Sequence, residues 1–144
     1  MLLTVALTAP LGVAACGDGD EATTSTTVEA AAEAPARVAV VTPDEAAATI
    51  ADPPPGLVVL DVRTPDEFAA GHLAGATMLD FYEPTFADEL AELDRDVPYV
   101  IYCRSGNRSG QTRALMAELG FQSVEDIDGG VIAWQDAGMP LTTG

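Results

Sequence analysis

The chain has 144 residues, a length that suits one domain with an appendage. It carries 23 acidic residues against six basic ones, all of them arginine, so its formal net charge is −17 at pH 7. A surface this acidic repels nucleic acid and anionic lipid headgroups, which argues against nucleic-acid binding and against electrostatic adsorption to membranes. The acidity itself needs no function beyond solubility.

The first 15 residues are small or apolar and include no acid, lysine or arginine. This stretch is too short to span a membrane and long enough for the apolar region of a signal peptide. It leads into Val13-Ala14-Ala15-Cys16-Gly17, which resembles the lipobox of bacterial lipoproteins. The resemblance implies cleavage before Cys16 and a diacylglycerol group on its sulfur. The protein would then be lipid-anchored in the cell envelope, on the outer side of the cytoplasmic membrane.

The leader departs from that pattern in one respect, because the positively charged segment that normally precedes the apolar region is missing. Three interpretations therefore stay open: a start codon further upstream, an atypical leader, or a cytoplasmic protein with an unstructured alanine-rich start. Residues 16–36 contain almost no large apolar side chain beyond the cysteine, and we expect a flexible acidic tether there. Its root-mean-square reach would be about 25 Å. The folded domain is expected over residues 37–144.

The first half of that domain contains two helix starts of the same kind. Thr42 and Thr64 each precede a proline and are followed three residues later by a glutamate, Glu45 or Glu67. These residues form a capping box, so helices are predicted to begin at both sites, the second running to about residue 70. The other elements expected here are strands at 38–41, 57–60 and 77–79, turns at 52–56 and 71–76, and an amphipathic helix at about 85–93.

The second half continues the alternation of strands and helices. Residues 97–102 are apolar, β-branched and aromatic, which predicts a buried strand, and a helix is expected over 111–119, closed by Gly120. The remaining expected elements are a strand at 124–127, a turn at 128–130 and a helix at 131–137 stopped by Gly138. This alternation predicts a three-layer α/β domain with a mostly parallel sheet, in which active sites lie at the carboxyl ends of strands.

Cys103 lies at such a strand end and is followed by a loop that feeds a helix. Arg104 and Arg108 lie in this loop and Arg113 lies just after it, so half of the arginines gather here. Loop N–H groups and the helix dipole add positive potential at one point, which favours a thiolate that faces an anion site. A lone cysteine at a strand end is usually a small buried hydrophobe, but arginines seldom crowd a core position. We therefore predict that Cys103 is a nucleophile.

Four segments resemble, in order, the marker segments of single-domain rhodaneses. They are Asp61–Phe68 (DVRTPDEF), Gly71–Ala76 (GHLAGA), Cys103–Ser109 (CRSGNRS) and Asp128–Trp134 (DGGVIAW). The match covers about residues 38–141 and implies a rhodanese fold, with a five-stranded, mostly parallel sheet flanked by helices and a persulfide-forming Cys103. One departure is Ala74, which stands where the family usually has proline and is expected to affect only the rigidity of the turn.

The resemblance also implies roles for the residues around Cys103. The anion-binding loop that would bind substrate consists of Arg104, Ser105, Gly106, Asn107 and Arg108. Asp61 and Arg63 are expected to tie the end of their strand to neighbouring loops rather than to touch substrate. His72 is expected to be a hydrogen-bonded turn residue, because sulfur transfer to a preformed thiolate needs no base. Trp134 is expected to pack in the core beneath the last helix.

The implied activity is sulfur transfer in two steps. The Cys103 thiolate attacks the outer sulfur of a small anionic donor such as thiosulfate, and sulfite leaves. A thiophilic acceptor, cyanide or a thiol, then removes the sulfur from the Cys103 persulfide. No metal or organic cofactor is expected, because the cysteines and the single histidine lack metal-ligand spacing. A disulfide between Cys16 and Cys103 is not expected either.

Two alternatives compete with this interpretation. The first is a persulfide carrier or sensor that docks an unknown protein partner and turns over little free thiosulfate. The second is a phosphatase or arsenate reductase on the same fold. Cysteine phosphatases use a Cys-x5-Arg loop that encloses a phosphoryl group, whereas four residues separate Cys103 from Arg108 and the x5 position is Ser109. The shorter loop favours a single transferred sulfur atom.

Overall fold

The computed structural model describes residues 36–144. The expected signal peptide (residues 1–15), the lipidation site Cys16 and all but the last residue of the expected tether therefore lie outside the described residues. Within residues 36–144, no helix combines the length and apolar character needed to cross a membrane. The first strand begins at Arg37.

Five strands alternate with five helices along the described chain. The strands are β1 (Arg37–Val41), β2 (Val58–Asp61), β3 (Thr77–Met78), β4 (Pro98–Tyr102) and β5 (Ser123–Ile127). The helices are α1 (Pro43–Ala51), α2 (Pro65–Ala70), α3 (Phe86–Glu92), α4 (Asn107–Leu119) and α5 (Gly130–Asp136). All strand pairs of the sheet are parallel, in the order β1-β5-β4-β2-β3. The α/β class and the parallel five-stranded sheet predicted from the sequence are confirmed.

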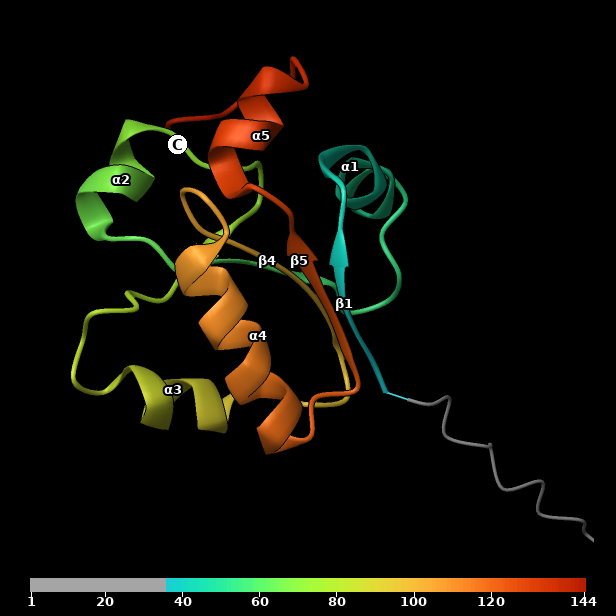
Figure 1. Ribbon diagram of the computed structural model, residues 1–144, viewed down its shortest axis with the longest axis vertical. Coiled ribbons are helices and arrows are strands. Elements are labelled where there is room, and N and C mark those ends of the chain that lie inside the picture. Colours follow the sequence, from blue (N-terminus) through green and yellow to red (C-terminus); the bar gives the residue numbers. More distant parts are fainter. Residues whose placement is uncertain (1–35) are drawn as a thin grey trace, which may run out of the picture. The chain divides into compact units, whose positions relative to one another are not determined.

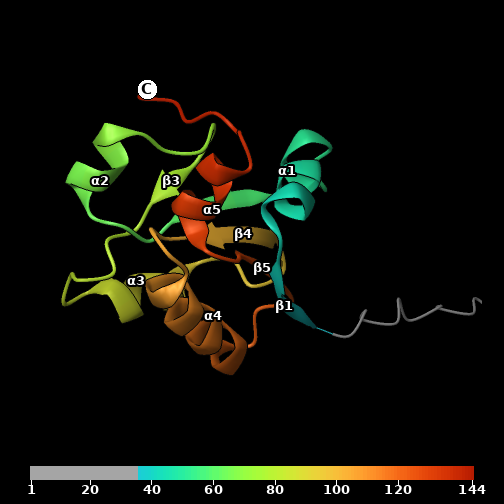
Figure 2. The ribbon, with the colours of Figure 1, turned by 45° about the horizontal axis from the view of Figure 1, so that its top comes forward.

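Helices cover both faces of the sheet and bury a separate apolar cluster on each (Figures 1 and 2). On one face, α3 and α4 pack against alternate residues of the central strands, with Leu90 and Met116 fully buried. On the other face α1 and α5 do the same, with Ala46 and Trp134 buried. Because β4 lies in the middle of the sheet, its end is enclosed from both sides, and Cys103 follows at that end.

Both predicted capping boxes are present. The Thr42 hydroxyl accepts from the Glu45 N–H at 3.3 Å while the Glu45 carboxylate accepts from the Thr42 N–H at 2.8 Å. Thr64 and Glu67 repeat the arrangement at 3.4 and 3.1 Å. Each box satisfies backbone donors that the first turn of a helix leaves unpaired, which explains why α1 and α2 begin where they do.

One helix begins earlier than the sequence indicates. The expected start was Gln111, but α4 begins at Asn107, directly after Gly106, whose φ of 90° is in the left-handed region. This conformation is open to glycine and lets the chain turn from the loop into the helix without intervening residues. Arg108 and Ser109 therefore lie in the first turn of α4 rather than in a loop that precedes it.

Candidate active site

The Cys103 sulfur lies in a cradle of backbone N–H groups. Cys103 follows β4, and the chain folds back so that the Gly106 N–H donates to the sulfur at 3.1 Å. The residue is 1% exposed and belongs to the core cluster beneath α3 and α4. The N-terminal turn of α4 follows at once, so its unpaired N–H groups and its dipole add positive potential near the sulfur.

Two opposing effects set the ionisation of this thiol. Burial raises the pKa of Cys103, since it disfavours the charged form. The Ser109 hydroxyl and the N–H groups of Ser109, Ser105 and Gly106 lie close enough to the sulfur to lower the pKa, and together they outweigh burial, so the pKa lies below its usual range. The loop thus favours a thiolate, mainly through these donor groups rather than through arginine side chains.

Arg108 forms an ion pair with Glu67. Its guanidinium donates two hydrogen bonds to the Glu67 carboxylate of α2, at 2.8 and 2.7 Å. It also lies over the ring of Tyr82, 5.5 Å from the centroid. Arg108 holds the pKa of Glu67 down at about 2. Its expected role in binding an anionic donor stays a prediction, and the donor would have to compete with Glu67.

The arginines near the loop differ in how far they are neutralised. Arg113 donates to the buried Asp126 carboxylate at 3.2 Å, so its charge is also partly compensated. Arg104 is exposed, and within residues 36–144 no carboxylate lies within ion-pair distance of it. Of the loop cations, Arg104 is therefore the one with a guanidinium available to an incoming anion.

Asp61 and Arg63 tie the end of β2 to the loop after α2. Both are buried, and their side chains pair at 2.6 Å. Arg63 also donates to the Gly71 carbonyl at 2.7 Å, and its N–H donates to Asp61 Oδ1 at 3.0 Å. This is the tying role expected from the sequence.

His72 and Trp134 are structural residues, as expected. The His72 Nδ1 is 2.9 Å from the Phe68 carbonyl oxygen, and the two rings stack with centroids 3.7 Å apart. The Trp134 indole lies on the buried face of α5 and donates to the Pro140 carbonyl at 3.1 Å. Neither side chain is hydrogen-bonded to the Cys103 loop.

A contact that sequence reasoning missed joins the loop to α5. The Val131 N–H donates to the Cys103 carbonyl at 2.9 Å, and the Ile132 N–H donates to the Arg104 carbonyl at 3.1 Å. The approach requires Gly130, whose φ is 58° and where an added Cβ would come within 2.8 Å of the Arg104 carbonyl carbon. The signal in the sequence is the glycine pair at 129–130, which by itself predicts only a turn.

We expect Gly130→Ala to displace the loop from α5. The free energy of unfolding should fall by about 1–3 kcal/mol from overpacking, and the activity of the site should fall with it. The matched control is Gly138→Ala, because Gly138 has a φ of 79° but open space around its Cβ position. Denaturant unfolding measures both variants, and equal losses would show that backbone strain alone, not contact with the loop, accounts for the effect.

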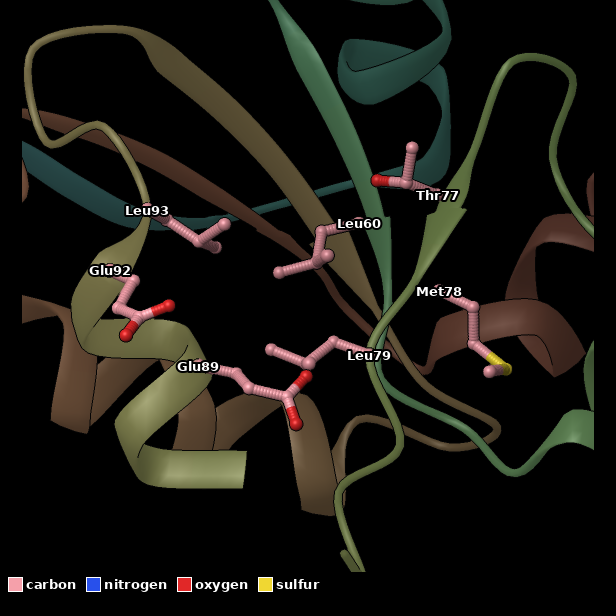
Figure 3. A pocket seen from close by; sticks show the side chains of 7 residues that line it. All are labelled: Leu60, Thr77, Met78, Leu79, Glu89, Glu92 and Leu93. Carbon is pink, nitrogen blue, oxygen red and sulfur yellow. The ribbon is translucent and has the colours of Figure 1, made fainter. Parts of the chain in front are cut away.

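An open hollow elsewhere in the domain takes no part in this site. Figure 3 shows it between the β2–β3 edge of the sheet and α3. Its lining residues are Leu60, Thr77, Met78, Leu79, Glu89, Glu92 and Leu93. None of them belongs to the loop over residues 103–109.

Comparison with known proteins agrees with the fold. Residues 42–137 match the family described as the rhodanese-like domain. A thiosulfate sulfurtransferase GlpE from Pseudomonas entomophila is 39% identical over 95 residues, which cover 66% of this chain and 83% of the relative. A rhodanese-related protein from Thermoplasma volcanium superimposes with a TM-score of 0.64 at 26% identity, covering 73% of this chain and 98% of that one. A rhodanese-like domain protein from Staphylococcus aureus gives 0.61 at 28%, covering 73% and 97%. The chain therefore belongs to the rhodanese-like domain family and is a sulfurtransferase of rhodanese type.

Proposed function

We propose that the chain moves a sulfane sulfur from thiosulfate or another persulfide donor to a thiophilic acceptor through a persulfide on Cys103. The observation that carries this proposal is the set of backbone donors around the sulfur, with the Gly106 N–H at 3.1 Å and a thiol pKa below its usual range. A thiolate at neutral pH is the form that attacks a sulfur atom. The curated relative from Pseudomonas entomophila is named for thiosulfate, which supports that donor.

The transfer takes two displacements. The Cys103 thiolate attacks the outer sulfur of thiosulfate, the sulfur–sulfur bond of the donor breaks, and sulfite leaves with the electron pair. Cyanide or a thiolate then attacks the outer sulfur of the persulfide and regenerates the Cys103 thiolate. In the second step negative charge develops at the Cys103 sulfur, which lies near the N–H groups of Ser105, Gly106 and Ser109, and these donors stabilise it without rearrangement. The exposed Arg104 attracts the anionic donor.

The pairing of Arg108 supports sulfur transfer over phosphoryl transfer. In a cysteine phosphatase the arginine of the loop must bind the phosphoryl oxygens. Here the Arg108 guanidinium uses two of its donors on Glu67, and the loop is one residue shorter than the x5 spacing. The phosphatase and arsenate reductase alternatives therefore have less support than sulfur transfer.

The test is steady-state turnover of thiosulfate with cyanide, together with intact-mass measurement after incubation with thiosulfate alone. We expect the mass of one added sulfur atom and cyanide-dependent turnover. Loading without turnover would favour the alternative of a persulfide carrier or sensor that docks a protein partner. Hydrolysis of aryl phosphates faster than sulfur transfer would contradict the proposal.

We also propose that Cys16 is lipidated and that the domain lies in the cell envelope. Support comes from the apolar leader, the small residues before Cys16 and the acidic stretch that follows. A diacylglycerol cysteine carries two acyl chains, enough for stable anchoring where one chain gives marginal binding.

Cys16→Ala should abolish labelling with a palmitate analogue and release the protein from the membrane fraction, or leave its leader uncleaved. Cell fractionation measures this, with Cys103→Ser as the matched control that keeps the anchor. A full-length, unlabelled, soluble wild-type chain would contradict the lipoprotein proposal and leave the sulfurtransferase proposal untouched.

A further inference from the structure

Within residues 36–144, two buried polar atoms, one in the first turn of α4 and one on the adjacent β5, lack hydrogen-bond partners. Ser109 of α4 and Asp126 of β5 are 0% and 3% exposed. Among the described residues, neither the Ser109 Oγ nor the Asp126 Oδ1 has a hydrogen-bond partner of ordinary geometry. Buried polar groups are normally paired, so each unpaired one calls for an explanation, such as a catalytic role or an ordered water. Ser109 lies on the helix that follows Cys103, and Asp126 packs against the same helix, which points to a shared role.

The first turn of α4 places the Ser109 hydroxyl beside both the Cys103 sulfur and the Asp126 carboxylate. It is close enough to lower the pKa of each, although it completes a full hydrogen bond to neither. Asp126 itself packs against α4, since a Cβ on Gly110 would lie 4.0 Å from the Asp126 Oδ2. The hydroxyl has a single proton and can donate it in one direction at a time.

The remaining charges around Asp126 are few. From α4, the Arg113 Nε donates to the other carboxylate oxygen at 3.2 Å. From the turn after β5, Asp128 adds a like charge. The sheet neighbours in register with Asp126 are apolar, Val40 of β1 and Ile101 of β4. Nothing on these strands competes with Ser109 for the Asp126 Oδ1.

We propose that Asp126 is a positioning residue that directs the single proton of the Ser109 hydroxyl, either toward its own carboxylate or toward the Cys103 sulfur. When Asp126 is ionised, the Ser109 O–H turns toward the Oδ1 atom and the thiolate loses a donor. When Asp126 is protonated, its own O–H donates to the Ser109 Oγ, and the Ser109 proton turns to the sulfur. No covalent bond changes except that of the proton exchanged between Asp126 and solvent.

The surroundings make the protonated form accessible. Burial raises the pKa of Asp126, and it outweighs Ser109 and Arg113, which lower it. Asp126 would then act on Cys103 through Ser109. The inference rests on the proposed function only in taking Cys103 as the reactive group.

The test is the pH titration of the Cys103 thiolate by its ultraviolet absorbance, with each variant compared against the same variant carrying Cys103→Ser. Asp126→Asn removes the charge and keeps an N–H donor for the Ser109 Oγ, so it imitates the protonated state. We expect it to move the midpoint to lower pH by about one unit. Ser109→Ala should move the midpoint to higher pH, because a donor is lost.

The decisive comparison is Asp126→Asn in the Ser109→Ala background. If Asp126 acts through Ser109, the downward shift should shrink to less than half, a coupling that a double-mutant cycle detects. An equal shift in both backgrounds would overturn the proposal, since it would mean simple charge repulsion. No shift in either background would also overturn it.

A matched control is Glu125→Gln. Glu125 is the adjacent buried acid on β5, but it faces the other side of the sheet, where its carboxylate accepts from Thr49 at 2.9 Å. Glu125→Gln should leave the midpoint of the Cys103 titration unchanged.

If Asp126→Asn does not fold, the titration curve of the wild-type protein still tests the proposal, because a coupled pair of groups titrates over a wider pH range than one group. Ser109→Ala should narrow that range, and an unchanged width would overturn the proposal. The readout needs no turnover, so its failure is separate from failure of sulfur transfer.

Discussion

Cys103→Ser is expected to reduce sulfur transfer by roughly a hundredfold or more and to prevent the addition of a sulfur atom by thiosulfate. Serine is close to cysteine in size, but its hydroxyl is a poor nucleophile at neutral pH and forms no persulfide. The fold should survive, because the Gly106 N–H that donates to the sulfur can donate to a hydroxyl in the same place.

Turnover with cyanide and intact mass measure this result. Circular dichroism and denaturant unfolding provide the control, and the variant should keep a wild-type transition. Residual turnover above a few per cent in a homogeneous sample would mean that another group carries the sulfur. The carrier alternative predicts the same loss of loading, so the variant identifies the nucleophile and the wild-type turnover identifies the class of activity.

Local patterns predicted most of the elements because the physical causes of those elements are local. A capping box is complete within four residues, so Thr42 and Thr64 could be identified from the sequence and are confirmed. The strand order β1-β5-β4-β2-β3, in contrast, does not have a local cause. It depends on contacts between segments far apart in the chain, and the resemblance to a known family implied the number of strands but not this order.

The start of α4 shows where propensity misleads. Residues 107–110 read Asn-Arg-Ser-Gly, and asparagine, serine and above all glycine are poor helix formers, so the helix was expected to begin at Gln111. In the structure the left-handed Gly106 and the packing of α4 on the sheet outweigh that preference. The earlier start of α4 also affects the candidate active site, because it places Ser109 beside the Cys103 sulfur.

The polar partners of the site were the least predictable part. Arg108 was assigned to anion binding because of its position in the loop, and its partner Glu67 lies 41 residues earlier. Sequence spacing carries no information about that pair. Asp126 did leave a signal, because an acid inside a short strand that is otherwise expected to be buried needs a partner. Its partner Arg113 lies on α4, 13 residues earlier, and sequence spacing does not identify that pair either.

Glu67→Gln is expected to lower the free energy of unfolding at neutral pH by about 2–3 kcal/mol. The pKa of Glu67 is lowered from 4.5 to about 2, first by its hydrogen bonds with Arg108 and then by those of the capping box. A lowered pKa means that the carboxylate stabilises the folded state above the unfolded value of 4.5. That contribution is lost progressively as the pH falls from 4.5 toward 2. The side chains of Glu67 and Arg108 are 28% and 12% exposed, so solvent screens the pair only in part.

Glutamine tests the charge while keeping the cap, since its side-chain oxygen can still accept from the Thr64 N–H. The variant should therefore unfold with a flatter dependence on pH between 4.5 and 2 than the wild type. Glu45→Gln is the matched control, because Glu45 completes the same capping box on α1 and has no hydrogen-bonded arginine. It should change stability much less. If both variants lose the same stability, the cap and not the ion pair with Arg108 is what Glu67 contributes, and Arg108 would then be free to turn toward an anion beside Cys103.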